Sequence, residues 1–144
     1  MLGQGEFGAL YIADEVQTGL GRTGSLWSFD TFGVEPDIFI TGKGLSGGMY
    51  PIAAAVLSDR AGAWLDQDGW GHVSTFGGAE LGCVAALKTL EIIQRPETTA
   101  NAASVAAILG DGLAGLRARF AQLVEVRQCG LVFGLKFDTP TAAS

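Results

Sequence analysis

Short apolar runs, each ended by a polar or glycine-rich turn, fill the first third of the chain. Residues 9–13 (ALYIA), 37–41 (DIFIT) and 52–57 (IAAAVL) each have the length and apolar character of a buried strand. Pro36 and Pro51 stand just before the second and third runs. Residues 26–32 predict a helical turn between the first two strands. Asp59 is placed to cap a short helix over residues 60–65.

The periodicity changes from about residue 79 onward. Apolar residues from Leu81 to Ile93 recur at helical spacing, which predicts a helix to about Gln94, with Pro96 beyond its end. An alanine-rich helical segment follows, to about residue 120. Residues 123–127 and 131–137 then alternate as two strands separated by Gly130. We therefore expect two units: residues 1–94 as a sheet with helices, and residues 95–144 as an α+β unit.

Composition excludes several classes of protein. The chain is 48% hydrophobic and 17% charged, as in an ordinary globular protein. Its net charge of −6 argues against a nucleic-acid surface. No apolar run approaches the roughly 20 residues that span a bilayer, and residues 1–6 do not begin a signal peptide. The two cysteines have no metal-binding spacing, so we expect no metal and a reducing, cytoplasmic location.

Two charged residues stand where the first two predicted strands end. Asp14 follows the first apolar run, and Lys43 follows the second, between two glycines. Open α/β sheets bind ligands at the carboxyl ends of their strands. An acid that pairs with a ring nitrogen and an amine that forms a Schiff base are what pyridoxal-phosphate chemistry requires. The alternative for Asp14 is a cap on the next turn. The other lysines, Lys88 and Lys136, are expected on solvated faces.

The motifs around these residues resemble a known family. Residues 14–24 (DEVQTGLGRTG), 34–38 (VEPDI) and 42–48 (GKGLSGG) are similar to class III pyridoxal-phosphate-dependent aminotransferases, nearest to the ornithine and acetylornithine branch. The resemblance implies an α/β fold of type I. Residues 1–94 would then be the C-terminal part of the cofactor-binding large domain, with a mostly parallel sheet and helices. Residues 95–144 would begin the small α+β C-terminal domain.

The resemblance also implies residue roles and partners. Asp14 would pair with the pyridine nitrogen of pyridoxal 5'-phosphate, Lys43 would form the Schiff base and move protons, and Gln17 would contact the phenolic-oxygen side of the ring. The activity would be transfer of an amino group from an amino acid or ω-amine to a 2-oxo acid such as 2-oxoglutarate. The family forms homodimers with the cofactor at the subunit interface.

Two further sites follow from the same resemblance. Ser74 and Thr75, in the run STFGG, match the segment that binds the cofactor phosphate of the neighbouring subunit; the alternative is that they cap the next helix. Arg127 matches an arginine that grips a substrate carboxylate, although Gln128 replaces the glycine that usually follows it. The alternative is a surface strand arginine. His72, the single histidine, is expected in a loop role.

Other functions remain open at this stage. Residues 19–24 (GLGRTG) formally fit a dinucleotide-binding G-x-G-x-x-G, but they do not follow the strand directly and no full helix begins there. Aminomutases and decarboxylases share the Asp and Lys motifs. The family's glycine-rich phosphate loop, stacking aromatic and acidic switch residue lie upstream of the Asp14 strand, so we expect a piece of a larger protein. A truncated remnant without activity is therefore the main alternative.

Overall fold

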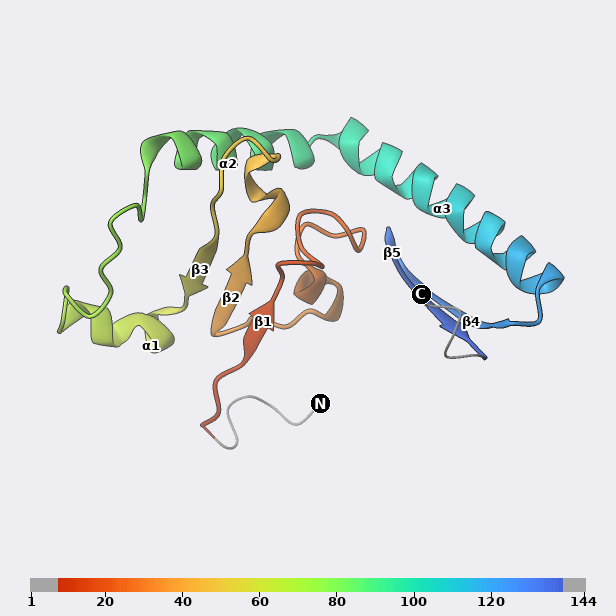
Figure 1. Ribbon diagram of the computed structural model, residues 1–144. Coiled ribbons are helices and arrows are strands. Elements are labelled where there is room, and N and C mark those ends of the chain that lie inside the picture. The colour runs from red at the N-terminus through yellow and green to blue at the C-terminus, as the bar shows by residue number, and fades with distance from the viewer. Residues whose placement is uncertain (1–7, 139–144) are drawn as a thin grey trace.

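The computed structural model describes residues 8–138 of the chain. The amino-terminal segment, for which the sequence predicts no signal peptide, lies outside these residues. A three-stranded sheet, in the order β1-β2-β3, forms the centre of the molecule in Figure 1. Helices α2 and α3 run along one side of the molecule, and a separate two-stranded sheet, β4-β5, lies beside α3. No described helix is long and apolar enough to cross a membrane.

The three central strands coincide with the predicted apolar runs. They are β1 (Ile12–Asp14), β2 (Ile38–Thr41) and β3 (Ala54–Leu57). β1 and β2 pair in parallel, with Ile12 opposite Ile38 and Asp14 opposite Ile40. Both strands therefore end at the same edge of the sheet, as the sequence predicts.

The third strand does not pair in parallel, although the sequence predicts a mostly parallel sheet. β3 pairs antiparallel with β2, with Thr41 opposite Ala54. The reason is the connection: after β2 comes the short 3-10 helix η2 (Lys43–Ser46), followed by turns, with no crossover helix to carry the chain back. The chain therefore re-enters the sheet at the edge where β2 ended. The sheet is mixed, within the α/β class that the sequence predicts.

Short helices lie between β1 and β2 and directly after β3. The aromatic stretch forms η1 (Ser28–Phe32), and α1 (Asp59–Gly62) continues into η3 (Ala63–Asp66). Asp59 was the predicted cap of this helix, but the cap is Ser58, whose hydroxyl accepts a hydrogen bond from Ala61 N at 3.3 Å. Asp59 lies in the first turn instead, because the helix begins one residue earlier than predicted.

The long helices and the hairpin match their predicted ranges closely. They are α2 (Glu80–Ile93), α3 (Pro96–Arg119), β4 (Leu123–Cys129) and β5 (Val132–Phe137). Pro96 is the first residue of α3, where its missing N–H costs nothing. Gly130 turns the hairpin with a φ of 56°, in the left-handed region that favours glycine.

A cluster of aromatic rings packs against the loop that follows β1. The rings of Trp27, Phe29 and Phe39 have centroids 4.9 to 6.5 Å apart. Gly19 lies against this cluster, and a Cβ at that position would come within 2.8 Å of the Trp27 ring and of the Glu15 carbonyl. A glycine is therefore required where the loop crosses the aromatic cluster. This packing holds the loop that carries the first sequence motif.

Candidate functional site

Lys43 projects from η2, directly after β2. Leu45 and Ser46 bury the inner side of this short helix, at 4% and 2% exposure, and the Ser46 hydroxyl hydrogen-bonds to the Tyr50 carbonyl. Lys43 itself is exposed and has a φ of 46°, a left-handed conformation that is uncommon outside glycine. The buried neighbours thus fix the helix while the amine of Lys43 is left accessible.

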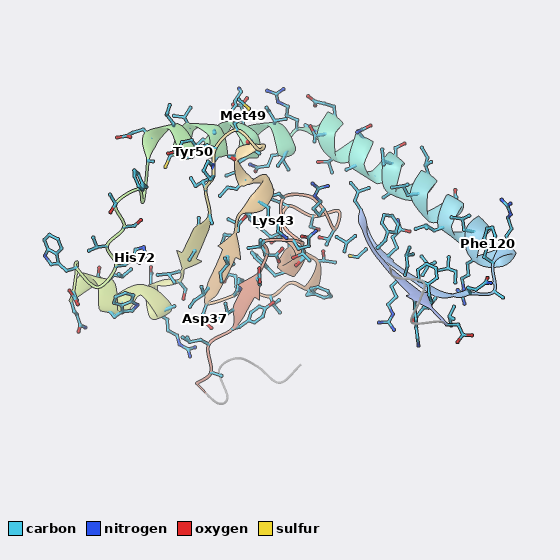
Figure 2. The ribbon with its side chains drawn as sticks, viewed as in Figure 1. Asp37, Lys43, Met49, Tyr50, His72 and Phe120 are labelled. Carbon is cyan, nitrogen blue, oxygen red and sulfur yellow. The ribbon has the colours of Figure 1, made fainter. Side chains whose placement is uncertain are left out.

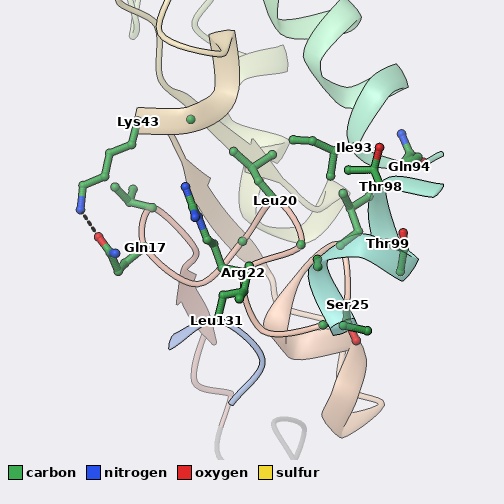
Figure 3. A pocket seen from close by; sticks show the side chains of 18 residues that line it. Gln17, Leu20, Arg22, Ser25, Lys43, Ile93, Gln94, Thr98, Thr99 and Leu131 are labelled. Atoms are coloured by element: carbon green, nitrogen blue, oxygen red, sulfur yellow. Dashed lines mark hydrogen bonds between the residues drawn. The ribbon is translucent and has the colours of Figure 1, made fainter. Parts of the chain in front are cut away.

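Gln17 is brought to Lys43 by the loop after β1. The Nζ atom of Lys43 donates a hydrogen bond to Oε1 of Gln17, as the dashed line in Figure 3 shows. No acidic group pairs with the Lys43 amine within residues 8–138. The amine therefore has a neutral partner, which leaves it available to react with a carbonyl compound.

Asp14 is the last residue of β1. Its Oδ1 accepts a hydrogen bond from Val16 N at 3.1 Å, so the side chain does cap the next turn, as the alternative from the sequence states. Its Oδ2 has no hydrogen-bond partner among residues 8–138. Because Asp14 lies opposite Ile40 in the sheet, Lys43 follows three residues beyond that register position. The acid and the amine therefore share one edge of the sheet.

Glu15 is a residue whose role the sequence analysis missed. It is 2% exposed, and it accepts hydrogen bonds from Thr18 Oγ1 (2.8 Å), Ser28 N (3.1 Å), Phe29 N (3.2 Å) and the Ser28 hydroxyl. Burial by itself raises the pKa of this carboxyl, but the hydrogen bonds from Ser28, Thr18 and Phe29 outweigh it and lower the pKa below 4.5. Glu15 thereby ties the start of η1 to the loop that holds Gln17. In the sequence, only the hydroxyl residues that follow Glu15 could have indicated that this carboxylate accepts hydrogen bonds.

The Ser74-Thr75 segment forms a turn before α2. Gly77 N donates to Ser74 O at 3.3 Å, and both hydroxyl residues are exposed. Neither caps α2, because the N-cap is Ala79 and no side chain makes a capping hydrogen bond there. Within residues 8–138 the two hydroxyls therefore have no capping role. In Figure 2 the neighbouring His72 lies on the same stretch of chain, well away from Lys43, in keeping with the expected loop role.

Arg127 lies on β4, away from Lys43. It is 77% exposed and forms a bidentate ion pair with Glu125, at 2.8 and 3.0 Å, which raises the pKa of the guanidinium. Gln128, which departs from the family pattern, donates to Ala106 O at 2.8 Å and so fastens β4 to α3. The remaining lysines behave as predicted: Lys88 pairs with Glu91 at 2.8 Å, and Lys136 is exposed.

A cavity of about 580 Å³ opens beside Lys43 and Gln17 (Figure 3). The loop after β1, the junction of α2 with α3, and Leu131 line it together with Lys43. Its lining includes Lys43 and Gln17, but not Asp14, Ser74, Thr75 or Arg127. Within the described part of the chain, no three His, Cys, Asp or Glu side chains are grouped as metal ligands. The structure thus brings Lys43 and Gln17 together in one cavity and does not bring the other predicted residues into its lining.

Comparison with known proteins places this arrangement in a family. The chain is 46% identical over 131 residues to an aminotransferase of Archaeoglobus fulgidus, covering 91% of this chain and 31% of that protein. It is 44% identical over 142 residues to an acetylornithine aminotransferase of Thermosynechococcus vestitus, covering 96% and 34%. The chain thus spans about a third of the length of these relatives.

A solved structure agrees with the sequence relatives. Taurine:2-oxoglutarate aminotransferase from Bifidobacterium kashiwanohense, in complex with PLP and glutamate, superposes with a TM-score of 0.83 at 28% identity, over 90% of this chain and 29% of that one. This likeness confirms the predicted fold class, a part of the type I transferase fold. The family model for class-III aminotransferases matches residues 5–144. The chain therefore belongs to the class-III aminotransferase family.

Proposed function

We propose that this chain carries the reactive lysine of a pyridoxal-phosphate-dependent aminotransferase. The enzyme would move an amino group from an amino acid or ω-amine to a 2-oxo acid such as 2-oxoglutarate. The observation that carries the proposal is the accessible Lys43 amine, hydrogen-bonded to Gln17 at the sheet edge where Asp14 also lies. The acetylornithine and putrescine aminotransferases among its relatives, at 44% and 41% identity, support the same class of substrates.

The residues present fit pyridoxal phosphate. Among residues 8–138, Lys43 offers an amine with no acidic partner, and one carboxylate oxygen of Asp14 has no hydrogen-bond donor, which suits a protonated ring nitrogen. The exposed hydroxyls of Ser74 and Thr75 suit the phosphate of a neighbouring subunit's cofactor. When bound, the cofactor supplies an electron sink for the carbon that loses its proton.

Each side chain then has a defined task. Lys43 would hold the cofactor through its Nζ atom, and the same amine would move a proton to and from the substrate. The carboxylate of Asp14 would keep the ring nitrogen protonated. The amide nitrogen of Gln17 can donate to the phenolic oxygen while its Oε1 holds Lys43 in place. Arg127 is assigned a substrate carboxylate by resemblance, and it would have to leave Glu125 to bind one.

The assembly and organisation belong to the same proposal. A homodimer would bring Ser74 and Thr75 of one subunit to the cofactor of the other. We place the boundary between the large and small domains at residues 94 and 95, in the short link between α2 and α3. Cys83 and Cys129 are both free thiols, which suits the expected cytoplasmic location.

Borohydride trapping tests the proposal directly. The purified chain is mixed with pyridoxal phosphate, scanned for a new absorbance band, reduced with borohydride and mapped by peptide mass spectrometry. We expect a single labelled peptide containing Lys43, and loss of the label in Lys43→Ala. The matched variants Lys88→Ala and Lys136→Ala should keep it. No label in the wild type, or a label that survives Lys43→Ala, would overturn the proposal and favour the inactive alternative.

A further inference from the structure

Lys43 holds an uncommon backbone conformation that needs support from its surroundings. Its φ of 46° is left-handed, although Gly42 and Gly44 on either side would adopt that region at lower cost. A residue strained in this way persists only where other contacts over-determine it. The helix η2 is only 4 residues long and has no side-chain cap at its start. Contacts outside η2 are therefore needed to hold the lysine in this conformation.

The hydroxyl of Ser46, the last residue of η2, supplies such a contact. It donates a hydrogen bond to the Tyr50 carbonyl and accepts one from Tyr50 N at 3.2 Å. These two bonds close the turn through Gly47 and Gly48, whose φ values of 63° and 82° are left-handed. Because Ser46 is 2% exposed, water has little access to either bond. One buried side chain thus fastens the end of η2 to the chain that follows it.

Tyr50 is held in turn by helix α2. Gly82 is buried on this helix, and a Cβ at that position would come within 2.9 Å of the Tyr50 ring. Thr89 of the same helix lies against Gly47, where a Cβ would be 3.3 Å from the Thr89 hydroxyl oxygen. Figure 2 shows Tyr50 directly beneath α2. Helix α2 therefore supports both ends of the turn that Ser46 closes.

We propose that Ser46 is a positioning residue for the Lys43 amine, and that it acts through Tyr50 and helix α2. Its hydroxyl bonds to Tyr50, not to the amine, and so fixes the backbone from which Lys43 reaches Oε1 of Gln17. A lysine has a flexible four-carbon stem, so a fixed backbone and a fixed partner restrict its amine to one place. The inference rests on the proposed function for the reactivity of Lys43.

The side-chain amide of Gln17 reports the position of the amine without any cofactor. In the ¹⁵N-labelled chain, Lys43→Met removes the hydrogen bond and so defines the chemical shift of the unbound Gln17 amide. We expect Ser46→Ala to move the signal most of the way to that value. Ser46→Thr, which keeps a hydroxyl, should stay closer to the wild type. Ser58→Ala is the matched control: it removes the hydroxyl that caps α1, which also weakens the fold, and should leave the signal in place.

Gly82→Ala tests the route through α2, and it carries the test if Ser46→Ala does not fold. Its Cβ would displace the Tyr50 ring, so the Gln17 signal should move in the same direction as in Ser46→Ala. Gly112→Ala is the matched control, because a Cβ on this exposed position of α3 meets open space. A Gln17 signal that Ser46→Ala or Gly82→Ala leaves unmoved would overturn the inference.

The inference would be equally wrong if Lys43→Met left the Gln17 signal unmoved, or if Ser58→Ala or Gly112→Ala moved it as far as Ser46→Ala does.

The rate of labelling by pyridoxal phosphate and borohydride connects the position of the amine to its reactivity. We expect Ser46→Ala to lower the rate at which label appears on Lys43 roughly tenfold, because a misplaced amine reacts more slowly. Ser58→Ala should be labelled at the wild-type rate, and an unchanged rate in Ser46→Ala would contradict the positioning role. A wild-type chain without label at Lys43 would instead refute the proposed function, and the Gln17 signal would still decide the role of Ser46.

Discussion

Glu15 shows how one buried carboxylate organises the loop that carries the site. Its neighbour Asp14 faces the sheet edge, whereas Glu15 points inward and binds the first two amides of η1. Glu15 thereby anchors the N-terminus of η1, where Asp30 of the same helix also accepts a hydrogen bond from Trp27 N at 3.2 Å. Because Gln17 follows two residues later, the geometry of Lys43 and Gln17 depends on this anchor.

We expect Glu15→Gln to destabilise the chain in a pH-dependent way. The pKa of Glu15 is lowered on folding from 4.5, so its ionised form adds stability above about pH 4.5, and this stability is lost as the pH falls through the folded pKa. At pH 7 the variant should lose about 1–3 kcal/mol of unfolding free energy, as for a buried hydrogen bond to a charged group. Below the folded pKa the difference should shrink. Urea unfolding at several pH values measures both effects.

Glu35→Gln is the matched control for this variant. Glu35 is exposed and is not part of the Glu15 network, so the same chemical change there should leave the unfolding free energy nearly unaltered. If Glu15→Gln and wild type were equally stable at pH 7, the anchoring role of Glu15 would be wrong.

At the scale of elements, the β4-β5 hairpin is docked on the loop after β1 through its turn. Gly130 lies so close to this loop that a Cβ would be 2.5 Å from Thr23 C and 2.6 Å from Arg22 O. The same turn contributes the Leu131 N–H that binds Arg22. The thiol of Cys129 also lies 3.7 Å from Thr23 O. Two segments far apart in the sequence thus meet backbone to backbone beside the cavity.

Gly130→Ala should loosen this contact. Alanine is disfavoured at the left-handed φ of 56°, and its Cβ would collide with backbone atoms that cannot rotate away. We expect a loss of at least about 1–2 kcal/mol in thermal or urea unfolding.

Gly134→Ala provides the comparison within the same hairpin. The nearest atom to a Cβ there is Arg127 Cβ at 3.8 Å, an ordinary contact, so this variant should be as stable as the wild type or slightly more so. Equal effects of the two substitutions would show that close packing at Gly130 does not hold the hairpin.

The molecule as a whole exposes more surface than a compact monomer of its mass. Its accessible area is 10220 Å², whereas a chain of 14.9 kDa is expected to expose about 7,000 Å². Leu81, Val84 and Leu87 form an apolar row on α2, with 74%, 65% and 68% of their surfaces exposed. Exposed apolar rows of this kind mark surfaces that other polypeptide covers.

We therefore expect the purified chain to associate in solution. Sedimentation equilibrium should give an average mass above 14.9 kDa that rises with concentration. Leu87→Glu should lower this mass, because a charge interrupts the apolar row on α2. Asn101→Glu, on the exposed surface of α3, should leave it unchanged. A concentration-independent monomer would contradict the expectation.

The sequence by itself determined the helices and strands, the α/β class and the pair of Asp14 and Lys43 at neighbouring strand ends. It could do so because hydrophobic periodicity and strand-end chemistry are local properties of the chain. Only the tertiary structure decided that β3 runs antiparallel, that Gln17 meets Lys43 across 26 positions, and that Glu15 is buried. It also decided that Arg22 and Leu131 line the same cavity. These features depend on contacts between residues distant along the chain, which follow from packing and are not encoded in any single stretch of sequence.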